Sequence, residues 1–370
     1  MGSGEAWSSA GAWAGWRGGQ RGRLARGAGV GVGAGWVSGR AGEAAEPGPG
    51  SQPAEPSTLE ALTQAAIICT MALAIIMLNL LIIAVYVNIR GPHEMVFWYV
   101  LSLAGADLCC GVLIVPLSVY PVLLGKWVYG DVLCRFAGYA AAVLWTISVY
   151  TLMWMSVDRY LAVRKPLRYE TVQTKTRCQC WVAFTWISSA MMCLPPLLDY
   201  SLPIFDGESF LCSLDWGRMA AYSITLAVLV LGPSLITIFY TYSYILSIIR
   251  KLKQGHAATM HDKEYVSAVS ESLANPSHAV AFTIILVFWL SWIPLISLKL
   301  LEYFANTQFK VPYLHFAVVW LGIANSIWKA FILVALSPQF RVGLRLLCLT
   351  LCCRTKGRLP LELLGMDPDD

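Results

Sequence analysis

Residues 61–89 read ALTQAAIICTMALAIIMLNLLIIAVYVNI and contain no Asp, Glu, Lys or Arg. A helix that crosses a bilayer needs about 20 consecutive, mostly apolar residues. This stretch exceeds that length, and the core of a soluble protein does not require such a charge-free run. The stretch therefore predicts a transmembrane helix and makes the chain a membrane protein.

Six further apolar stretches follow the first one. Four contain no charged residue, and the other two contain one each, Asp107 in the second stretch of the chain and Lys329 in the last. In chain order the six are 95–124, 136–157, 178–198, 219–249, 272–298 and 311–340. Composition agrees, since 57% of the 370 residues are hydrophobic and only 13% are charged. The pattern predicts an all-α membrane protein, a seven-transmembrane helix bundle.

Basic residues cluster on one side of the predicted bundle. The segments after the third and fifth stretches and the C-terminal tail are basic, whereas the opposite loops offer little beyond Lys126, Arg218 and Lys310. Loops rich in Lys and Arg stay on the cytoplasmic side. We therefore expect a multi-pass plasma-membrane protein with an extracellular N terminus and a cytoplasmic C terminus. This topology accounts for the net charge of +5, so no nucleic-acid partner is expected.

Four segments make up the expected organisation. Residues 1–57 are rich in Gly, Ala, Ser and Pro without a helical period, which predicts a disordered extracellular arm. Residues 58–336 form the seven-helix domain, 337–353 an amphipathic eighth helix on the cytoplasmic membrane surface, and 354–370 a cytoplasmic tail. S-palmitoylation would add a lipid anchor to the eighth helix, and buried thiols are the alternative. The candidate cysteines are Cys348, Cys352 and Cys353.

Motifs for catalysis and metal binding are missing from the sequence. It has five His residues and no His-Glu-x-x-His, Gly-x-Ser-x-Gly or phosphate-loop pattern. We expect neither an enzyme nor a bound metal or cofactor. A channel or transporter would use Asp107 and Lys329 along its pathway, but the sequence shows no internal repeat.

Short motifs at the inner end of the third span and within the sixth span point to a family. They are Asp158-Arg159-Tyr160 followed by Pro166, and Phe288-x-x-Ser-Trp292-Ile-Pro294. With Asp107 in the second span, they stand in the order found in rhodopsin-like (class A) G-protein-coupled receptors. The chain between about residues 60 and 353 resembles that family, as an orphan-type member distantly similar to amine receptors.

The resemblance implies a receptor that passes an extracellular or membrane-borne signal to heterotrimeric G proteins, or that signals constitutively. Arg159 would then contact the G protein. Trp292, beside the Pro294 kink and packed on Phe288, would be the conformational switch below the outer cavity. Many relatives hold the arginine with an acid where this chain has Ala274, so we expect a weak inactive-state contact. The alternative is a receptor-like protein with little signalling that binds or traffics another membrane protein.

The seventh span departs from the family pattern. The family has Asn-Pro-x-x-Tyr where this chain has Lys329-Ala-Phe-Ile-Leu333. A lone lysine at bilayer depth is costly unless it is paired, and Asp107 occupies the acidic position that faces this part of the seventh span in relatives. We predict an Asp107–Lys329 ion pair that, with Ser148 and Asn325, replaces the sodium site of relatives. The alternative is that Lys329 extends elsewhere and Asp107 is protonated.

Some features of the family's extracellular side are present in this sequence, and others are replaced. The resemblance implies a disulfide between Cys134 and Cys212, which the oxidising secretory route permits. Ala141 replaces the aspartate of amine receptors, so an amine ligand is disfavoured. The other positions implied to line the cavity are Trp145, Thr225, Leu229, Leu295, Ile296, Lys299, His315, Val319, Trp320 and Ile323. Such a cavity suits a lipid or other apolar small molecule, with Lys299 or His315 contacting an acidic head, and a collapsed cavity is equally compatible.

Overall fold

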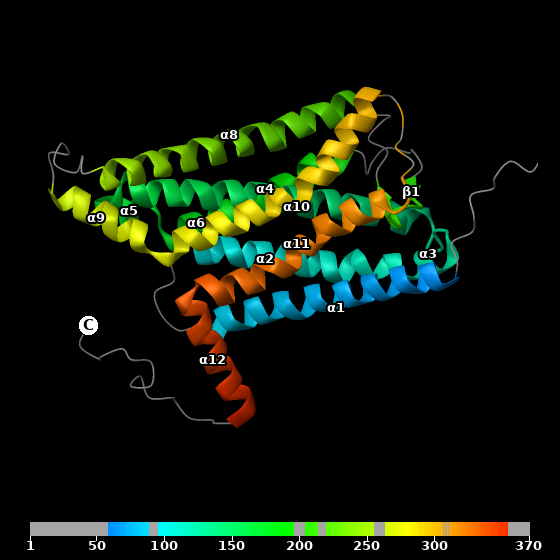
Figure 1. The fold of residues 1–370 in the computed structure, drawn as a ribbon, viewed down its shortest axis with the longest axis horizontal. Coiled ribbons are helices and arrows are strands. Elements are labelled where there is room, and N and C mark those ends of the chain that lie inside the picture. Colours follow the sequence, from blue (N-terminus) through cyan, green and yellow to red (C-terminus); the bar gives the residue numbers. More distant parts are fainter. Residues whose placement is uncertain are drawn as a thin grey trace, which may run out of the picture. The chain divides into compact units, whose positions relative to one another are not determined.

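The helical part of the chain is described by a computed structural model that covers residues 58–88, 95–195, 204–213, 220–254, 263–305, 307, 309 and 311–353. These residues lie in one unit, residues 54–370. Seven long helical segments run side by side (Figure 1). They are α1 (Thr58–Asn88), α2 (Val96–Leu113), α4 (Asp131–Arg164), α6 (Lys175–Met192), α8 (Ala220–Lys253), α10 (Pro276–Ala305) and α11 (Leu314–Leu336).

Six of these segments are long and apolar enough to cross a membrane, among the described residues. The seventh, α6, begins with Lys175 and Arg177 and has 18 residues, so its composition is less apolar. It nevertheless packs in the bundle, because Trp181 of α6 stacks on Trp154 of α4 with ring centroids 4.2 Å apart. The hydroxyl of Tyr139 on α4 also donates a hydrogen bond of 3.0 Å to the carbonyl of Ala190.

Short elements join the long helices at both ends of the bundle. One end carries the 3-10 turn η1 (Val115–Ser118), α3 (Val119–Leu124) and the antiparallel hairpin of β1 (Ile204–Asp206) and β2 (Leu211–Ser213). The other end carries η2 (Pro166–Arg168), α5 (Tyr169–Val172) and α9 (Lys263–Ala274). In α2 the regular helix stops just before Pro116, which has no backbone N–H to donate.

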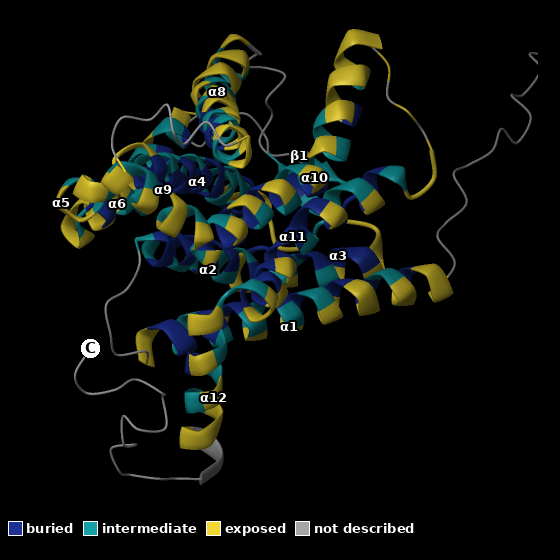
Figure 2. Ribbon diagram, turned by 60° about the vertical axis from the view of Figure 1, so that its left-hand side comes forward, coloured by how far each residue is buried: buried dark blue, intermediate teal, exposed yellow. Residues whose placement is uncertain are grey.

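The outward faces of the helices are apolar, as a lipid environment requires. Figure 2 shows exposed residues along the outer sides of α1, α8 and α10. They include Leu73, Ile236 and Phe239, whose exposures are 65%, 71% and 77%. Water would penalise such surfaces, whereas lipid tails solvate them and leave packing and hydrogen bonds to join the helices.

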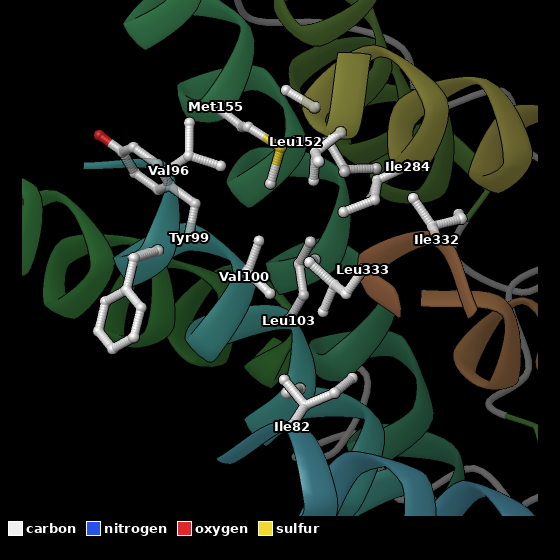
Figure 3. Packing of buried hydrophobic residues seen from close by; sticks show 14 of the residues in the cluster. Ile82, Val96, Tyr99, Val100, Leu103, Leu152, Met155, Ile284, Ile332 and Leu333 are labelled. Carbon is white, nitrogen blue, oxygen red and sulfur yellow. The ribbon is translucent and has the colours of Figure 1, made fainter. Parts of the chain in front are cut away.

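The main apolar cluster fills the half of the bundle nearer to α9. Figure 3 shows Val100 and Leu103 of α2, Leu152 of α4, Ile284 of α10 and Leu333 of α11 meeting between the helices. Leu333 is completely buried. This position, where relatives have a tyrosine hydroxyl, is therefore an apolar contact here.

A helix at a steep angle to the bundle follows α11 (Figure 1). This helix, α12 (Pro338–Cys353), begins after Ser337, whose hydroxyl accepts a hydrogen bond from the N–H of Phe340. Phe340 is fully buried and its ring lies 5.5 Å from that of Tyr86 on α1. Phe340 therefore anchors the start of α12 to the bundle.

Candidate functional site

Two opposite charges meet in the middle of the bundle. The Nζ of Lys329 on α11 lies 2.7 Å from the Oδ2 of Asp107 on α2, and both side chains are at least 92% buried. The hydroxyl of Ser326 donates to the other oxygen of Asp107 at 2.8 Å. On α1, the side-chain amide of Asn79 donates to the backbone carbonyl of Ser326 at 3.2 Å. The site therefore connects three helices, α1, α2 and α11.

The helical period explains why Ser326 and Lys329 act on the same carboxylate. Residues three apart lie on one face of a helix, so both side chains leave α11 toward α2. Away from water, each charge is stabilised only if the other one and further hydrogen bonds satisfy it. Lys329 and Ser326 together supply these contacts to both oxygens of Asp107.

The two other residues predicted for this site are buried, but they make different contacts. The hydroxyl of Ser148 donates to the backbone carbonyl of Leu144 on its own helix at 3.0 Å. Asn325 precedes Ser326, so its side chain leaves α11 about 100° away from that of Ser326. Ser326 and Asn79 were missed. The sequence contained a signal for each of them. Ser326 stands three residues before Lys329, and Asn79 is a polar residue within the first apolar stretch.

At the inner end, Arg159 of α4 is buried among polar groups. Its guanidinium contacts Asp158 at 2.5 Å, the hydroxyl of Tyr169 on α5 at 3.0 Å and the hydroxyl of Ser277 on α10 at 2.5 Å. Tyr169 in turn donates to Asp158 at 2.9 Å. Burial raises the pKa of Tyr169, so its phenol remains a neutral donor. The positive charge is thus neutralised within α4, and a neutral hydroxyl links it to α10.

The start of α10 positions Ser277. Asn275 stands before Pro276, and its side-chain oxygen accepts hydrogen bonds from the N–H of Ser277 at 2.9 Å and from its hydroxyl at 2.7 Å. This is an N-cap with proline at the first helical position, which ends α9 and starts a new helix. The cap orients the same serine that accepts from Arg159. Ala274, where relatives have an acid, supplies no charge.

Trp292 lies in the middle of α10 against three neighbours. Its ring centroid is 6.2 Å from that of Phe288 and 6.1 Å from that of Trp145 on α4. On its α11 side, a Cβ added to Gly322 would lie only 3.0 Å from the Trp292 ring. Gly322 therefore provides the room for this tryptophan, a role that the sequence analysis did not identify.

Side chains of the protein occupy part of the outer region expected to hold a ligand. Phe210, in the β1–β2 hairpin, is 7% exposed and lies 6.3 Å from Phe316 on α11. The indole N–H of Trp320 donates to the backbone carbonyl of Ser209 at 3.2 Å. The two best-defined cavities of the described residues, about 410 and 440 Å³, lie elsewhere. One is beside Trp98 and Trp186, and the other lies at the inner ends of α1, α2 and α10.

The predicted lining residues behave differently from one another. Trp145, Trp320 and Ile323 pack in the bundle, and Ala141, Leu295, Ile296 and Val319 are partly buried. Thr225 and Leu229 on α8 are exposed. Lys299 and His315, expected to contact an acidic ligand head, both contact Glu302 of α10 instead, at 3.1 and 2.8 Å.

A disulfide fastens the hairpin to the bundle. Cys134 in the first turn of α4 is bonded to Cys212 of β2, as predicted. Trp127 lies beside it, with its indole N–H donating to the carbonyl of Gly130 at 2.8 Å. Of the three cysteines considered for palmitoylation, Cys348 is exposed on α12. The side chains of Cys352 and Cys353 lie outside the described residues.

Comparisons with known proteins give this geometry a family. Residues 78–331 match the model of the 7 transmembrane receptor (rhodopsin family). The chain is 31% identical to mouse (Mus musculus) G-protein coupled receptor 52 over 272 residues, covering 70% of this chain and 73% of that protein. It is 26% identical to human (Homo sapiens) probable G-protein coupled receptor 21, covering 73% of this chain and 79% of that protein.

The crystal structure of squid rhodopsin has the same fold, with a TM-score of 0.67 at 19% identity, covering 82% of this chain and 90% of that one. The predicted fold class, seven transmembrane helices, is thereby confirmed. The predicted receptor function is confirmed too, and the family is one of receptors and not of enzymes. The chain belongs to the rhodopsin family of seven-transmembrane receptors and is a multi-pass G-protein-coupled receptor.

Proposed function

We propose that this receptor lies in the plasma membrane with its N terminus outside and signals to heterotrimeric G proteins at high basal level through Arg159. The observation that carries this proposal is the contact of Arg159 with α10. It runs through the neutral hydroxyl of Ser277, at the point where α9 ends and α10 begins. Opening of α10 away from α4 breaks this contact and exposes the guanidinium to the G protein.

The chemistry of this contact sets how readily the inner end opens. A hydrogen bond to an ionised group is roughly twice as strong as one between neutral groups, and an arginine–carboxylate contact adds the attraction of two opposite charges and often a second hydrogen bond. In this receptor Asp158 on the same helix already neutralises Arg159, and α10 offers a hydroxyl where many relatives offer a carboxylate. The closed state is therefore less strongly favoured, and the open state is populated without a ligand.

The middle of the bundle contributes differently. The ammonium group of Lys329 lies next to Asp107, and the family resemblance implies a sodium ion beside this aspartate in relatives. A second cation at this site would meet the charge of Lys329 at close range. We therefore assign Asp107, Lys329 and Ser326 the role of a permanent, sodium-independent connection between α2 and α11.

The side chains in the outer region are compatible with signalling that needs no small amine ligand. Trp145 and Trp292 pack against each other below it, and Phe210 and Trp320 fill it from the hairpin and from α11. Ala141 provides no charge for an ammonium group. Ile323 stands where opsins have the lysine that holds retinal, so we do not extend the similarity to melanopsin, 25% identical in mouse (Mus musculus), to light detection. An apolar or lipid-like ligand would have to displace these side chains.

The test is ligand-free signalling through each G protein class in cells that express the full chain. Arg159→Ala at the same surface level should lose the signal that exceeds that of cells without receptor. Ser267→Ala is the matched control, because this serine is exposed on α9 and its hydroxyl donates to the carbonyl of Glu264 on its own helix. Equal signals from the wild type and Arg159→Ala in every class would reject basal coupling and support the alternative of a binding or trafficking protein.

A further inference from the structure

Three ionisable side chains meet at the outer ends of α10 and α11. The Nε2 of His315 lies 2.8 Å from the Oε1 of Glu302, and its Nδ1 lies 2.5 Å from the Oε2 of Glu208. His315 and Glu302 are buried, whereas the side chain of Glu208 is 54% exposed. Since Glu208 belongs to the turn between β1 and β2, the imidazole joins the hairpin to two helices of the bundle.

The protonation state of the imidazole decides whether both contacts can exist. A neutral imidazole carries one N–H, and its other nitrogen presents a lone pair. At 2.5 Å that lone pair would repel the carboxylate oxygen, whereas the imidazolium presents an N–H and a positive charge to each carboxylate. The contact with Glu208 lacks the angle of a directed hydrogen bond, so charge is what holds it.

Charged groups of α10 and of the hairpin lie around His315. Among the described residues, Lys299 of α10 is the neighbouring cation, and it already contacts the second oxygen of Glu302 at 3.1 Å. The carboxylates that contact His315 come from two elements, Glu208 of the hairpin turn and Glu302 of α10. Asp206 of β1 accepts from Ser209, and Glu60 of α1 accepts from Tyr313. Two carboxylates therefore lie within 2.8 Å of the imidazole.

The hairpin transmits this contact to α11. Ser209 follows Glu208, and its carbonyl accepts from the indole of Trp320 on α11. Phe210 follows in turn and packs against Phe316. Release of Glu208 therefore loosens a segment that packs directly on the helix that carries Lys329.

We propose that His315 is a binding site for a proton from the outer solution, which fastens the hairpin 204–213 to α10 and α11. Histidine titrates within about pH 5 to 8 in proteins. In acid the imidazolium holds both Glu208 and Glu302, and as the pH rises the contact with Glu208 is lost. External protons are then a ligand of this receptor. The assignment of the outer side rests on the proposed orientation.

Hydrogen exchange of the full-length receptor in lipid nanodiscs tests the site. After correction for intrinsic rates, amides of residues 204–213 should exchange about fivefold more slowly at about pH 5.5 than at about pH 8, because the charged contact exists only in acid. Glu208→Gln, which changes a side chain that is 54% exposed, and His315→Asn should both remove the difference. Asp131→Asn, an exposed carboxylate elsewhere on the outer side, should retain it. The proposal is overturned if exchange of residues 204–213 in the wild type does not depend on pH, or if neither substitution changes that dependence.

Signalling in cells separates this proposal from the proposed function. Basal signal should change with external pH in the wild type and in Asp131→Asn, and should be constant in Glu208→Gln. Proton-dependent protection of the hairpin in a receptor that signals to no G protein would retain the proton site and reject basal coupling alone. Signalling that depends on pH equally in the wild type and Glu208→Gln would reject the site alone.

Discussion

Arg159 and Lys329, both buried among the described residues, have partners that differ in one respect. Lys329 on α11 is neutralised by Asp107 on α2, so its ion pair joins two helices. Arg159 is neutralised by Asp158, the preceding residue of the same helix, and contacts α10 through the hydroxyl of Ser277. Separation of α2 from α11 would leave two buried charges without partners, whereas separation of α4 from α10 breaks the hydrogen bond to Ser277 and leaves Arg159 paired with Asp158. The ion pair therefore holds α2 and α11 together in the middle of the bundle, whereas the inner ends of α4 and α10 can separate.

Removal of the lysine should have the largest effect. Lys329→Met leaves Asp107 buried without a counter-ion, and breaking a buried pair in this way costs about 3–5 kcal/mol of unfolding free energy. Thermal unfolding of the purified receptor measures the loss. Lys251→Met, at an exposed position on α8, should change stability little.

The double variant Asp107→Asn with Lys329→Met sharpens this prediction. It removes both charges together, so most of the stability lost in the single variant should return, because no buried charge remains. If the stability loss of the double variant equals the sum of the losses of the two single variants, the ion pair does not connect the helices as described.

An added methyl group next to Trp292 should have the next largest effect. Gly322→Ala places a Cβ about 3.0 Å from the indole ring, and overpacking of this kind costs about 1–3 kcal/mol. The indole has to shift, so basal signalling should change together with the melting temperature. Gly232→Ala on α8 is the control, since a Cβ there meets no atom within 4 Å. Identical melting temperatures for both alanine variants would contradict the close contact.

Substitutions at Ser277 should have a smaller effect on stability, with a visible effect on signalling. Ser277→Ala removes a hydrogen bond to a charged group, worth about 1.5 kcal/mol, and should raise basal signal up to about tenfold, and Ser277→Glu should lower it by adding a charged partner for Arg159. Surface-normalised assays with Ser267→Ala and Ser267→Glu as controls measure this. Lower signal in Ser277→Ala would place the contact in the active state.

Much of the difference between the Lys329 and Arg159 sites could be predicted from the sequence, because this difference depends on charge. A lysine within an apolar span needs a partner, and Asp107 was the available one. The departure from the family acid at Ala274 could be read as well. The roles of Ser277 and Gly322 could not, since they depend on how α10 is rotated toward α4 and α11. Ser148 and Asn325, predicted to join the ion pair, are buried in the core, but Ser326 is the residue that donates to Asp107, because the rotation of α11 toward α2 decides which side chain faces the carboxylate.

Replacement of sodium should have the smallest effect on stability and signalling, because we expect no effect at all. We propose that the ammonium of Lys329 takes the place of the ion, so replacing sodium by potassium at constant ionic strength should change neither the melting temperature nor basal signalling. A change specific to sodium would show that Asp107 still binds this ion.

The most direct measurement compares two distances in the same receptor. Spin labels on unnatural amino acids at Lys165 and Ala274 report the inner ends of α4 and α9, and labels at Val112 and Leu321 report α2 and α11; all four positions are exposed. With the G protein class identified in the signalling assay, the first distance should lengthen, with a longer component already present in the free receptor. The second distance should stay constant. A first distance that stays fixed while the second one changes would contradict the account.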